Sequence, residues 1–571
     1  MCWGRTFAGV LALTGCMVFT MAELAPAQCE VAKLLASDGS AYDLFGTAVA
    51  ISGRAAVVGA AWDINENGYH SGSAYVFSHD GSSWVEERKL LPSDGAASDH
   101  FGCCVAFSGD TAVIGAEAHG SCGAAYVFQY DGVGWVQVAK LLASDGAADD
   151  KFGGSVAVDG DTIVAGAPGD DSARGAAYFF TRPPGGWVTA TETGKLLASD
   201  GAPGDRFGGY LSVAVADDTI LVGASAADAL AEQSGAAYMF RYDGLNWIEE
   251  KLVASDGAAG DYFGRSVAVD GNTALIGAYG GDGCGSGYVF ELDGGAWQQS
   301  AKLTASDRAP DDRFGYTVAL SAGTALVGAF RDDDSGTDSG SVHVFEKPLA
   351  GWMDMTETHK LLASDGDADD FFGETVTMDG DTALVGAHND EENGSQSGSA
   401  YLFSLAERPA LVAVDPGANG SLPKTDYNVI RLTFCSPITL PPAGNALMMT
   451  ELTDPNNDVS DLFTYTIDAA EPTGATLKAT EVGSALTNQT WLRVASAPAW
   501  PDVVPFAFDL CVLRGDANNS GRVTTADYSE VKAHLGERGE TRYDLNGSAR
   551  ITTADYSVVK ANMGHRAPTK P

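Results

Sequence analysis

The chain has 571 residues, of which 45% are apolar and 70 are glycine, and its formal net charge at pH 7 is −42. Apolar content at this level excludes a chain that is disordered throughout, and the negative charge opposes binding to nucleic acid or to an anionic membrane surface. The length exceeds that of one ordinary domain, although internal repeats can extend a single fold.

Residues 1–27 are predicted to be an export signal, so we expect an extracellular or cell-surface protein. Arg5 supplies a short basic start, residues 7–21 are mostly apolar, and Ala25-Pro26-Ala27 matches a cleavage site. The apolar run is short for a membrane-spanning helix. The alternative to simple secretion is a lipid anchor on Cys16, because Leu13-Thr14-Gly15-Cys16 resembles a lipobox.

One sequence motif recurs seven times between residues 28 and 405. It consists of a Lys-Leu strand, a Ser-Asp pair, the tetrapeptide Asp-x-Phe-Gly and an apolar run that ends in Gly-Ala. The Phe-Gly pairs follow one another at intervals of 51 to 58 residues and are Phe45-Gly46, Phe101-Gly102, Phe152-Gly153, Phe207-Gly208, Phe263-Gly264, Phe314-Gly315 and Phe372-Gly373. Repeats of about this length that are built from short strands indicate a propeller.

Each repeat divides into four short strands, which is the content of one propeller blade. In the fifth repeat the predicted strands are residues 266–269, 273–278, 287–290 and 297–303. The seventh repeat lacks its fourth strand, whereas residues 31–35 supply such a strand ahead of the first repeat. We therefore predict a closed ring of seven blades rather than an open solenoid, because the N-terminal strand would cover a free sheet edge.

These residues resemble the FG-GAP repeats, best known from the propeller of integrin α chains, and most closely a bacterial variant with Trp…Lys-Leu-x-Ala-x-Asp-Gly between blades. Integrin-type blades carry an Asp-x-Asp-x-Asp-Gly calcium loop before the Gly-Ala strand. Here that place holds only short turns, such as Asp159-Gly160-Asp161. Because calcium takes roughly six to eight oxygen ligands, we do not expect integrin-like calcium sites in these blades.

Several side chains recur in the repeats or interrupt them. Two aspartates per repeat, for example Asp256 and Asp261, are predicted to accept hydrogen bonds from turn N–H groups, with ion binding as the alternative. The longer polar loops at residues 63–68, 331–334 and 389–394 are predicted to be insertions, with a weak cation or ligand site as the alternative. The tryptophans at one repeat position are predicted to pack rather than to form a sugar platform, and are Trp84, Trp135, Trp187, Trp247, Trp297 and Trp352.

Residues 406–513 lack the repeat motif and show a different sequence pattern. The alternating runs at residues 429–434 and 490–494 read as strands with one buried face. Residues 428–451 resemble the Ig-like domains of bacterial surface proteins, which implies an Ig-like β-sandwich that acts as a spacer.

The cysteines allow disulfides after export. Cys435 and Cys511 form the favoured pair because both fall in the predicted sandwich, and Cys103 with Cys122 is a weaker alternative. Cys284 is predicted to be a small buried residue.

The tail contains two matching twelve-residue segments whose oxygen donors have the spacing of the EF-hand calcium loop. At loop positions 1, 3, 5 and 12 stand side-chain donors, and position 7 offers a backbone carbonyl. The predicted calcium ligands are Asp516, Asn518, Ser520, Arg522 and Asp527 in the first loop, and Asp544, Asn546, Ser548, Arg550 and Asp555 in the second.

Each loop leads into one helix with an apolar face, and no helix precedes the first loop. This duplicated loop–helix over residues 514–566 resembles a type I dockerin, the α-helical calcium module that docks secreted proteins onto cohesin domains. The resemblance implies calcium as the cofactor and cohesin contacts at Thr525, Ala526, Lys532, Thr553, Ala554 and Lys560. Serine at position 5 of both loops, and Ala549 at position 6 of the second, predict weaker calcium binding. The alternative is a calcium-stabilised cap without a cohesin partner, and residues 567–571 form a short tail.

The sequence contains no His-Glu-x-x-His motif, nucleophile elbow or phosphate loop. The leading hypothesis is a secreted, non-enzymatic interaction or adhesion protein, in which the propeller binds a protein or glycan and the tail tethers it to a cohesin-type partner. One alternative is a subunit of an extracellular polysaccharide-degrading, cellulosome-like assembly, with glycoside hydrolase activity if two carboxylates are suitably placed. The other is a purely structural surface protein. The ligand itself is not predicted, because it depends on loops carried by a shared fold.

Overall fold

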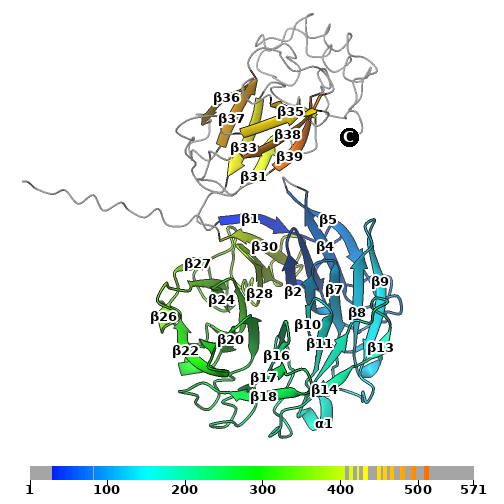
Figure 1. Ribbon diagram of the computed structural model, residues 1–571, viewed down its shortest axis with the longest axis vertical. Coiled ribbons are helices and arrows are strands. Elements are labelled where there is room, and N and C mark those ends of the chain that lie inside the picture. The colour runs from blue at the N-terminus through cyan, green and yellow to red at the C-terminus, as the bar shows by residue number, and fades with distance from the viewer. Residues whose placement is uncertain are drawn as a thin grey trace, which may run out of the picture.

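The repeats form a seven-bladed β-propeller (Figure 1). The computed structural model describes residues 29–80 and 83–405, and beyond them only the backbone of strands between residues 411 and 512. The predicted export signal, residues 1–27, and the dockerin-like residues 514–566 lie outside the described residues. Among those described, no helix has the length and apolar character needed to span a membrane.

The blades are antiparallel four-stranded units that follow the order of the repeats. Blade one has β2 (Phe45–Ser52), β3 (Ala55–Ala60), β4 (Ser73–His79) and β5 (Trp84–Leu90); blade two has β6 (Phe101–Ser108), β7 (Thr111–Ala116), β8 (Ala124–Tyr130) and β9 (Trp135–Leu142); blade three has β10 (Ser155–Asp159), β11 (Thr162–Ala167), β12 (Ala176–Thr181) and β14 (Gly194–Leu196); blade four has β15 (Val213–Ala216), β16 (Thr219–Ala224), β17 (Ala236–Tyr242) and β18 (Trp247–Leu252).

Blades five to seven repeat this arrangement, and the last one takes a strand from the N-terminus. Blade five has β19 (Ser266–Asp270), β20 (Thr273–Ala278), β21 (Ser286–Asp293) and β22 (Ala296–Thr304); blade six has β23 (Thr317–Ser321), β24 (Thr324–Ala329), β25 (Ser341–Glu346) and β27 (His359–Leu361); blade seven has β28 (Thr375–Asp379), β29 (Thr382–Ala387), β30 (Ser399–Ser404) and β1 (Cys29–Leu34). Short strands β13 (Ala190–Thr191) and β26 (Met355–Thr356) add parallel pairs to β9 and β22. The described helices are single turns: η1 (His119–Ser121), α1 (Asp170–Ala173) and η2 (Gly281–Gly283).

The predicted closure of the ring is confirmed. Strand β1 pairs antiparallel with β30, with Lys33 opposite Tyr401 and Leu34 opposite Ala400. The innermost strand of blade one, β2, contacts those of both blade two and blade seven. The N-terminal strand thus covers the edge that the seventh repeat would otherwise leave unpaired.

The recurring Phe-Gly and Gly-Ala pairs hold neighbouring blades together. In blade five, Phe263 is fully buried and meets the rings of Tyr288 and Phe290 edge-on, with centroids 5.5 and 6.0 Å away. Gly264 has φ +88°, and a Cβ on Gly223 of blade four would lie 1.9 Å from the Gly264 carbonyl oxygen. Both glycines therefore allow a backbone approach that no side chain permits.

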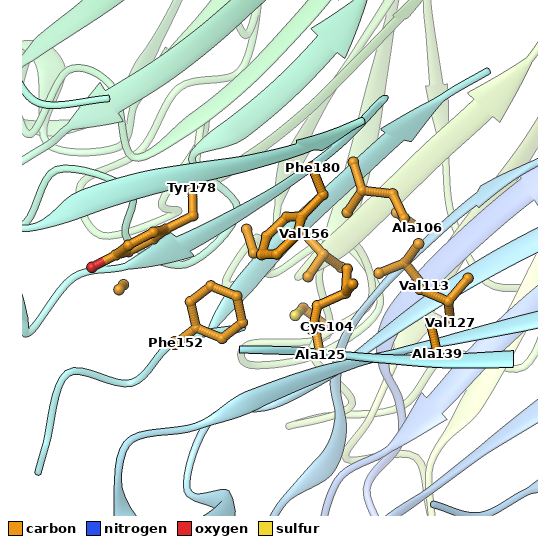
Figure 2. Packing of buried hydrophobic residues seen from close by; sticks show 14 of the residues in the cluster. Cys104, Ala106, Val113, Ala125, Val127, Ala139, Phe152, Val156, Tyr178 and Phe180 are labelled. Atoms are coloured by element: carbon orange, nitrogen blue, oxygen red, sulfur yellow. The ribbon is translucent and has the colours of Figure 1, made fainter. Parts of the chain in front are cut away.

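Figure 2 shows the same interface between blades two and three. Phe152 lies beside Tyr178 and Phe180 of its own blade, and Cys104 and Ala106 of blade two belong to the same buried cluster. The blade tryptophans also serve packing, as predicted: Trp135, Trp187, Trp297 and Trp352 are each about 5–6% exposed, and Trp84 and Trp247 pack half-buried against core clusters.

The four cysteines whose side chains are described, Cys103, Cys104, Cys122 and Cys284, are all free thiols. The Cys103–Cys122 alternative is therefore wrong. The Sγ of Cys103 faces the Gly153 carbonyl of the next blade, whereas the Sγ of Cys122 faces the Gly120 carbonyl in its own loop. Cys284 is only half-buried, so the prediction of a buried residue is also wrong.

The strands between residues 411 and 512 form two further sheets. One contains β31 (Leu411–Asp415), β33 (Val429–Phe434), β37 (Thr476–Glu481) and β36 (Phe463–Ile467); the other contains β32 (Ser421–Leu422), β39 (Ala507–Val512), β38 (Thr490–Ser496), β34 (Leu447–Glu451) and β35 (Asp454–Asp458). The chain is thus mainly β here too. The Ig-like sandwich stays a prediction, as does the Cys435–Cys511 pair, because Cys435 lies outside the described residues and the side chain of Cys511 is not described.

Candidate ligand-binding face around the channel mouth

The two recurring aspartates of each repeat have different partners. The second one accepts a backbone N–H in every blade, as Asp261 does from Ala258 at 2.7 Å, so the predicted turn role is confirmed for it. The first one instead binds side chains: Asp256 accepts hydrogen bonds from the Tyr288 hydroxyl at 2.9 Å and from Lys302 Nζ at 2.6 Å. These aspartates are therefore occupied by the repeat scaffold in blade five and its equivalents.

The seven innermost strands surround an apolar central channel with a cavity of about 260 Å³. A second cavity of about 280 Å³ shares Cys104, Leu211 and Thr375 with the channel and so marks its mouth. This mouth is polar, and its lining includes His100, Glu117, Tyr210, Arg265 and Glu374. These residues occupy positions near the Phe-Gly or Gly-Ala pairs, where the repeats differ from one another.

The residue between Asp and Phe in each Asp-x-Phe-Gly segment has a left-handed backbone. Their φ angles lie between 55° and 61°, and the residues are Leu44, His100, Lys151, Arg206, Tyr262, Arg313 and Phe371. Residues other than glycine adopt this conformation rarely, and it concentrates at functional sites. The repeat thus imposes one backbone shape at seven points while each side chain differs.

Aromatic side chains form a continuous series over blades five to seven, which we term the aromatic crescent: Tyr262, Tyr279, Tyr316, Phe330 and Phe371. The rings of Tyr262 and Tyr279 are parallel within 4° at a centroid distance of 4.9 Å. The next neighbours follow at 5.7, 4.6 and 5.4 Å.

Guanidinium groups lie over these rings. Arg265 lies 4.1 Å from the centroid of Tyr316, and Arg313 lies 5.3 Å from that of Tyr279. Such contacts hold the planar cations in place and leave their donors available along the edges.

Beside the crescent is a larger cavity of about 700 Å³, which we term the basic pocket. Its lining includes Lys151, Arg206 and Arg265 but only one carboxylate, Asp149. This local excess of positive charge contrasts with the net charge of −42 for the chain. The same wall presents the rings of Tyr210, Tyr262 and Tyr279.

Hydrogen bonds position the pocket wall. Lys151 Nζ donates to the Tyr210 hydroxyl at 2.9 Å, and that hydroxyl donates to Glu117. Arg265 donates to the Tyr210 carbonyl at 2.6 Å. The guanidinium of Arg206, in contrast, has no hydrogen-bond or ion-pair partner among the described residues, so its charge is available to a ligand.

Two carboxylates at the channel mouth are held in their ionised form. Burial acts to raise the pKa of Glu374, but His388, Arg265 and Tyr316 together lower it. Burial likewise opposes ionisation of Glu117, and hydrogen bonds from His100 and Tyr210 with the charge of Lys151 lower its pKa. Neither group is poised to act as an acid near neutral pH.

The sequence matches the FG-GAP repeat family at residues 29–77, 84–128, 135–180, 190–240, 247–290, 297–345 and 355–403. The chain belongs to the FG-GAP repeat family. It also matches the type I dockerin domain at residues 514–564, which confirms that resemblance. The predicted calcium ligands and cohesin contacts lie outside the described residues and stay predictions.

No curated protein matches this FG-GAP repeat protein. Solved structures that resemble it include a putative 6-phosphogluconolactonase from Bacteroides uniformis, with 14% identity, a TM-score of 0.42, and coverage of 59% of this chain and 90% of that one. A second from Bacteroides fragilis has 13% identity, a TM-score of 0.36 and coverage of 56% and 85%. The β-propeller domain of the Trilobed protease from Pyrococcus furiosus has 9% identity, a TM-score of 0.34 and coverage of 59% and 89%. At these TM-scores the structures do not inform the ligand or the activity.

The sequence prediction missed the crescent and the basic pocket. The available signal was the variation at fixed repeat positions, such as the residue between Asp and Phe. The prediction relied on features that repeat, and in the structure those residues form the framework of the blades.

Proposed function

We propose that this protein is an extracellular, non-enzymatic binding protein whose basic pocket and aromatic crescent bind an acidic saccharide, and whose dockerin tail attaches it to a cohesin-type partner. The observation that carries the proposal is the basic pocket itself, which places Lys151, Arg206 and Arg265 around about 700 Å³ on a strongly acidic chain. An acidic protein is expected to retain such a cluster of cations where a ligand carries negative charge.

The chemistry of the lining favours a saccharide with carboxylate or sulfate groups. A guanidinium binds planar oxyanions through two parallel hydrogen bonds, and Arg206 has its donors free. The apolar faces of sugar rings pack on aromatic rings, and Tyr262 and Tyr279 lie in the pocket wall. A protein ligand with exposed carboxylates is the alternative occupant of the same face.

Hydrolysis at the channel mouth is disfavoured. Glycosidases need one carboxylic acid whose pKa is raised, so that it can protonate the leaving group. Glu117 and Glu374 line one cavity, yet the surroundings lower the pKa of both. Membership of a polysaccharide-degrading assembly therefore fits best as binding rather than cleavage.

The tail supplies the attachment. Residues 514–566 would bind calcium through the two predicted loops and present Thr525, Ala526, Thr553 and Ala554 to a cohesin-type domain. Extracellular calcium is abundant enough for loops with fewer carboxylates than usual. Because the tail and the pocket are separate in sequence, tethering and saccharide binding should be lost independently.

The test is binding of the full chain to immobilised polygalacturonate, alginate and dextran sulfate, with unsubstituted cellulose as the neutral surface. Arg206→Gln should weaken binding to the acidic polymers about tenfold or more, as expected when a charged hydrogen bond is lost. Arg54→Gln, at an exposed turn between β2 and β3, is the matched control and should bind like the wild type. Equal binding to cellulose, no loss in Arg206→Gln, or release of reducing sugars would contradict the proposal.

A further inference from the structure

Six of the seven blades contain the same cluster of a lysine, a half-exposed aspartate and a buried tyrosine. The tyrosine hydroxyl donates to Oδ1 of the first repeat aspartate at 2.7–2.9 Å, and the lysine Nζ binds Oδ2 of that aspartate at 2.6–2.8 Å. The tyrosines are Tyr75, Tyr126, Tyr178, Tyr238, Tyr288 and Tyr401, each at most 1% exposed. The tyrosine hydroxyl thus connects the buried ring to the carboxylate of the first repeat aspartate.

Blade six departs from this pattern at one residue. His343 takes the place of the tyrosine: it lies opposite Lys360 in the β25–β27 pair, as Tyr288 lies opposite Lys302 in blade five. It is completely buried and meets Phe314 edge-on at 5.1 Å, as the tyrosines meet their own phenylalanines. Blade six therefore has the same strand pairing as the other blades, with an imidazole ring where they have a tyrosine ring.

The hydrogen bonds of His343 determine which ring nitrogen carries the proton. The Asp332 carboxylate forms an ion pair with Lys360 Nζ, so it accepts hydrogen bonds and donates none. The Ser341 hydroxyl therefore donates to Asp332, at 2.6 Å, and must accept from Nε2–H of His343, at 3.1 Å. In a neutral imidazole Nδ1 then carries the lone pair, and Nδ1 is buried without a hydrogen-bond partner.

Two carboxylates face this lone pair. Glu357 Oε2 lies 3.7 Å from Nδ1, and one ligand atom each from Asp307, His343 and Glu357 lies within 4.8 Å of the others. Lys360 binds Oδ2 of Asp307, but Oδ1, which accepts the tyrosine hydroxyl in the other blades, has no donor among the described residues. Three potential ligand atoms thus converge, and the N–H and hydroxyl of Ser306 hold the Glu357 carboxylate in place.

We propose that blade six binds a divalent transition-metal ion, with Zn²⁺ as the best fit, through Nδ1 of His343 and the carboxylates of Asp307 and Glu357. One imidazole and two carboxylates suit zinc better than calcium or magnesium, which prefer oxygen alone. Nδ1 and Glu357 Oε2 lie 3.7 Å apart, and all three ligand atoms lie within 4.8 Å of one another, so modest movement would bring them to tetrahedral positions around zinc. The Ser341–Asp332 pair orients the imidazole through its other nitrogen, as in known metal sites.

The local charge also favours a cation. Asp307, Asp332, Asp334 and Glu357 surround the site, and Lys360 is the only lysine or arginine that pairs with the three aspartates among the described residues. Asp307 is half-exposed, with 46% of its side chain accessible, so an ion can enter and keep a water ligand. The competing occupant is a proton on Nδ1, which would face Glu357 Oε2 at 3.7 Å.

The matched variant is His343→Tyr, which restores the residue of the other six blades and so keeps the fold. The full chain is saturated with calcium, dialysed against Zn²⁺ and then against zinc-free buffer containing calcium, and its zinc content and thermal midpoint are measured. The wild type should retain about one zinc ion per chain more than His343→Tyr, and zinc should raise only the wild-type midpoint. His70→Tyr, in blade one, should behave like the wild type.

A second variant, Asp307→Asn, keeps the imidazole and removes one ligand charge, and should weaken zinc binding at least tenfold. Equal zinc content in the wild type and His343→Tyr would overturn the proposal, because the free thiols or the tail would then be the sites. No zinc-dependent shift in the wild type, with His343 titrating as an ordinary imidazolium, would also overturn it and assign the position to a proton.

Discussion

The contact between the Gly-Ala and Phe-Gly glycines can be tested at blades four and five with Gly223→Ala. The new Cβ would lie 1.9 Å from the Gly264 carbonyl oxygen, whereas real Cβ atoms essentially never come closer than 3.0 Å. The two blades must therefore separate by about 1 Å, because no rotamer change can move the new Cβ atom or the Gly264 carbonyl group. Overpacking of this kind costs about 3 kcal/mol.

That cost can be converted into a thermal shift. The entropy of unfolding of the propeller, at about 2.1 cal/mol/K per residue over residues 29–405, is about 0.8 kcal/mol/K. A loss of about 3 kcal/mol should then lower the thermal midpoint by about 4 °C. Gly185→Ala is the control, since a Cβ there meets nothing within 4 Å and its φ is not positive.

The assay is thermal unfolding followed by circular dichroism at saturating calcium. Gly185→Ala should be unchanged or more stable by about 0.5–1 kcal/mol, because alanine restricts the unfolded chain. If Gly223→Ala unfolds within about 1 °C of Gly185→Ala, the inter-blade contact does not control stability and the explanation of the repeat motif is wrong.

Two further predictions concern charge and calcium. Burial raises the pKa of Asp370 to about 6, and the neighbouring Asp390 and Asp367 act in the same direction. Because the folded pKa lies above the unfolded value of 3.8, the folded state gains stability as pH falls from above 6 to about 4, by at most about 3 kcal/mol. Asp370→Asn keeps the acceptor for the Asp367 N–H, so it should stabilise the protein at pH 7 and flatten the urea-unfolding free energy between pH 5 and 7; destabilisation at pH 7 would refute this. In the tail, Asp516→Ala or EDTA should abolish capture by immobilised cohesin domains without changing saccharide binding, and capture that persists in EDTA would refute calcium-dependent docking.

The blades could be predicted because local pattern and global fold agree in them. The predicted strand at residues 273–278 is β20, and the predicted strand at residues 297–303 lies within β22. The N-terminal closure followed from two complementary defects in the repeat. In both cases seven copies of one pattern reinforced a weak signal from any single copy.

The candidate face could not be predicted, because ring geometry brings its residues together. Tyr262 and Phe371 are far apart in the chain, and only the arrangement of blades five to seven connects them through one series of rings. The partners of Asp256 also depend on the register that places Tyr288 opposite Lys302. His343 was open to prediction from the sequence, since it replaces a tyrosine of the other six copies, but its signal is an interruption of the pattern and not a histidine that recurs.

The most direct test of the central claim is calorimetric titration of the full chain with a short oligogalacturonate and with its methyl ester, for both the wild type and Arg206→Gln. The ester removes the negative charge and keeps the sugar rings. Esterification should weaken wild-type binding about tenfold or more, and Arg206→Gln should weaken binding of the acid but not of the ester. Equal affinity of the wild type for acid and ester, or an equal loss for both ligands in Arg206→Gln, would contradict it.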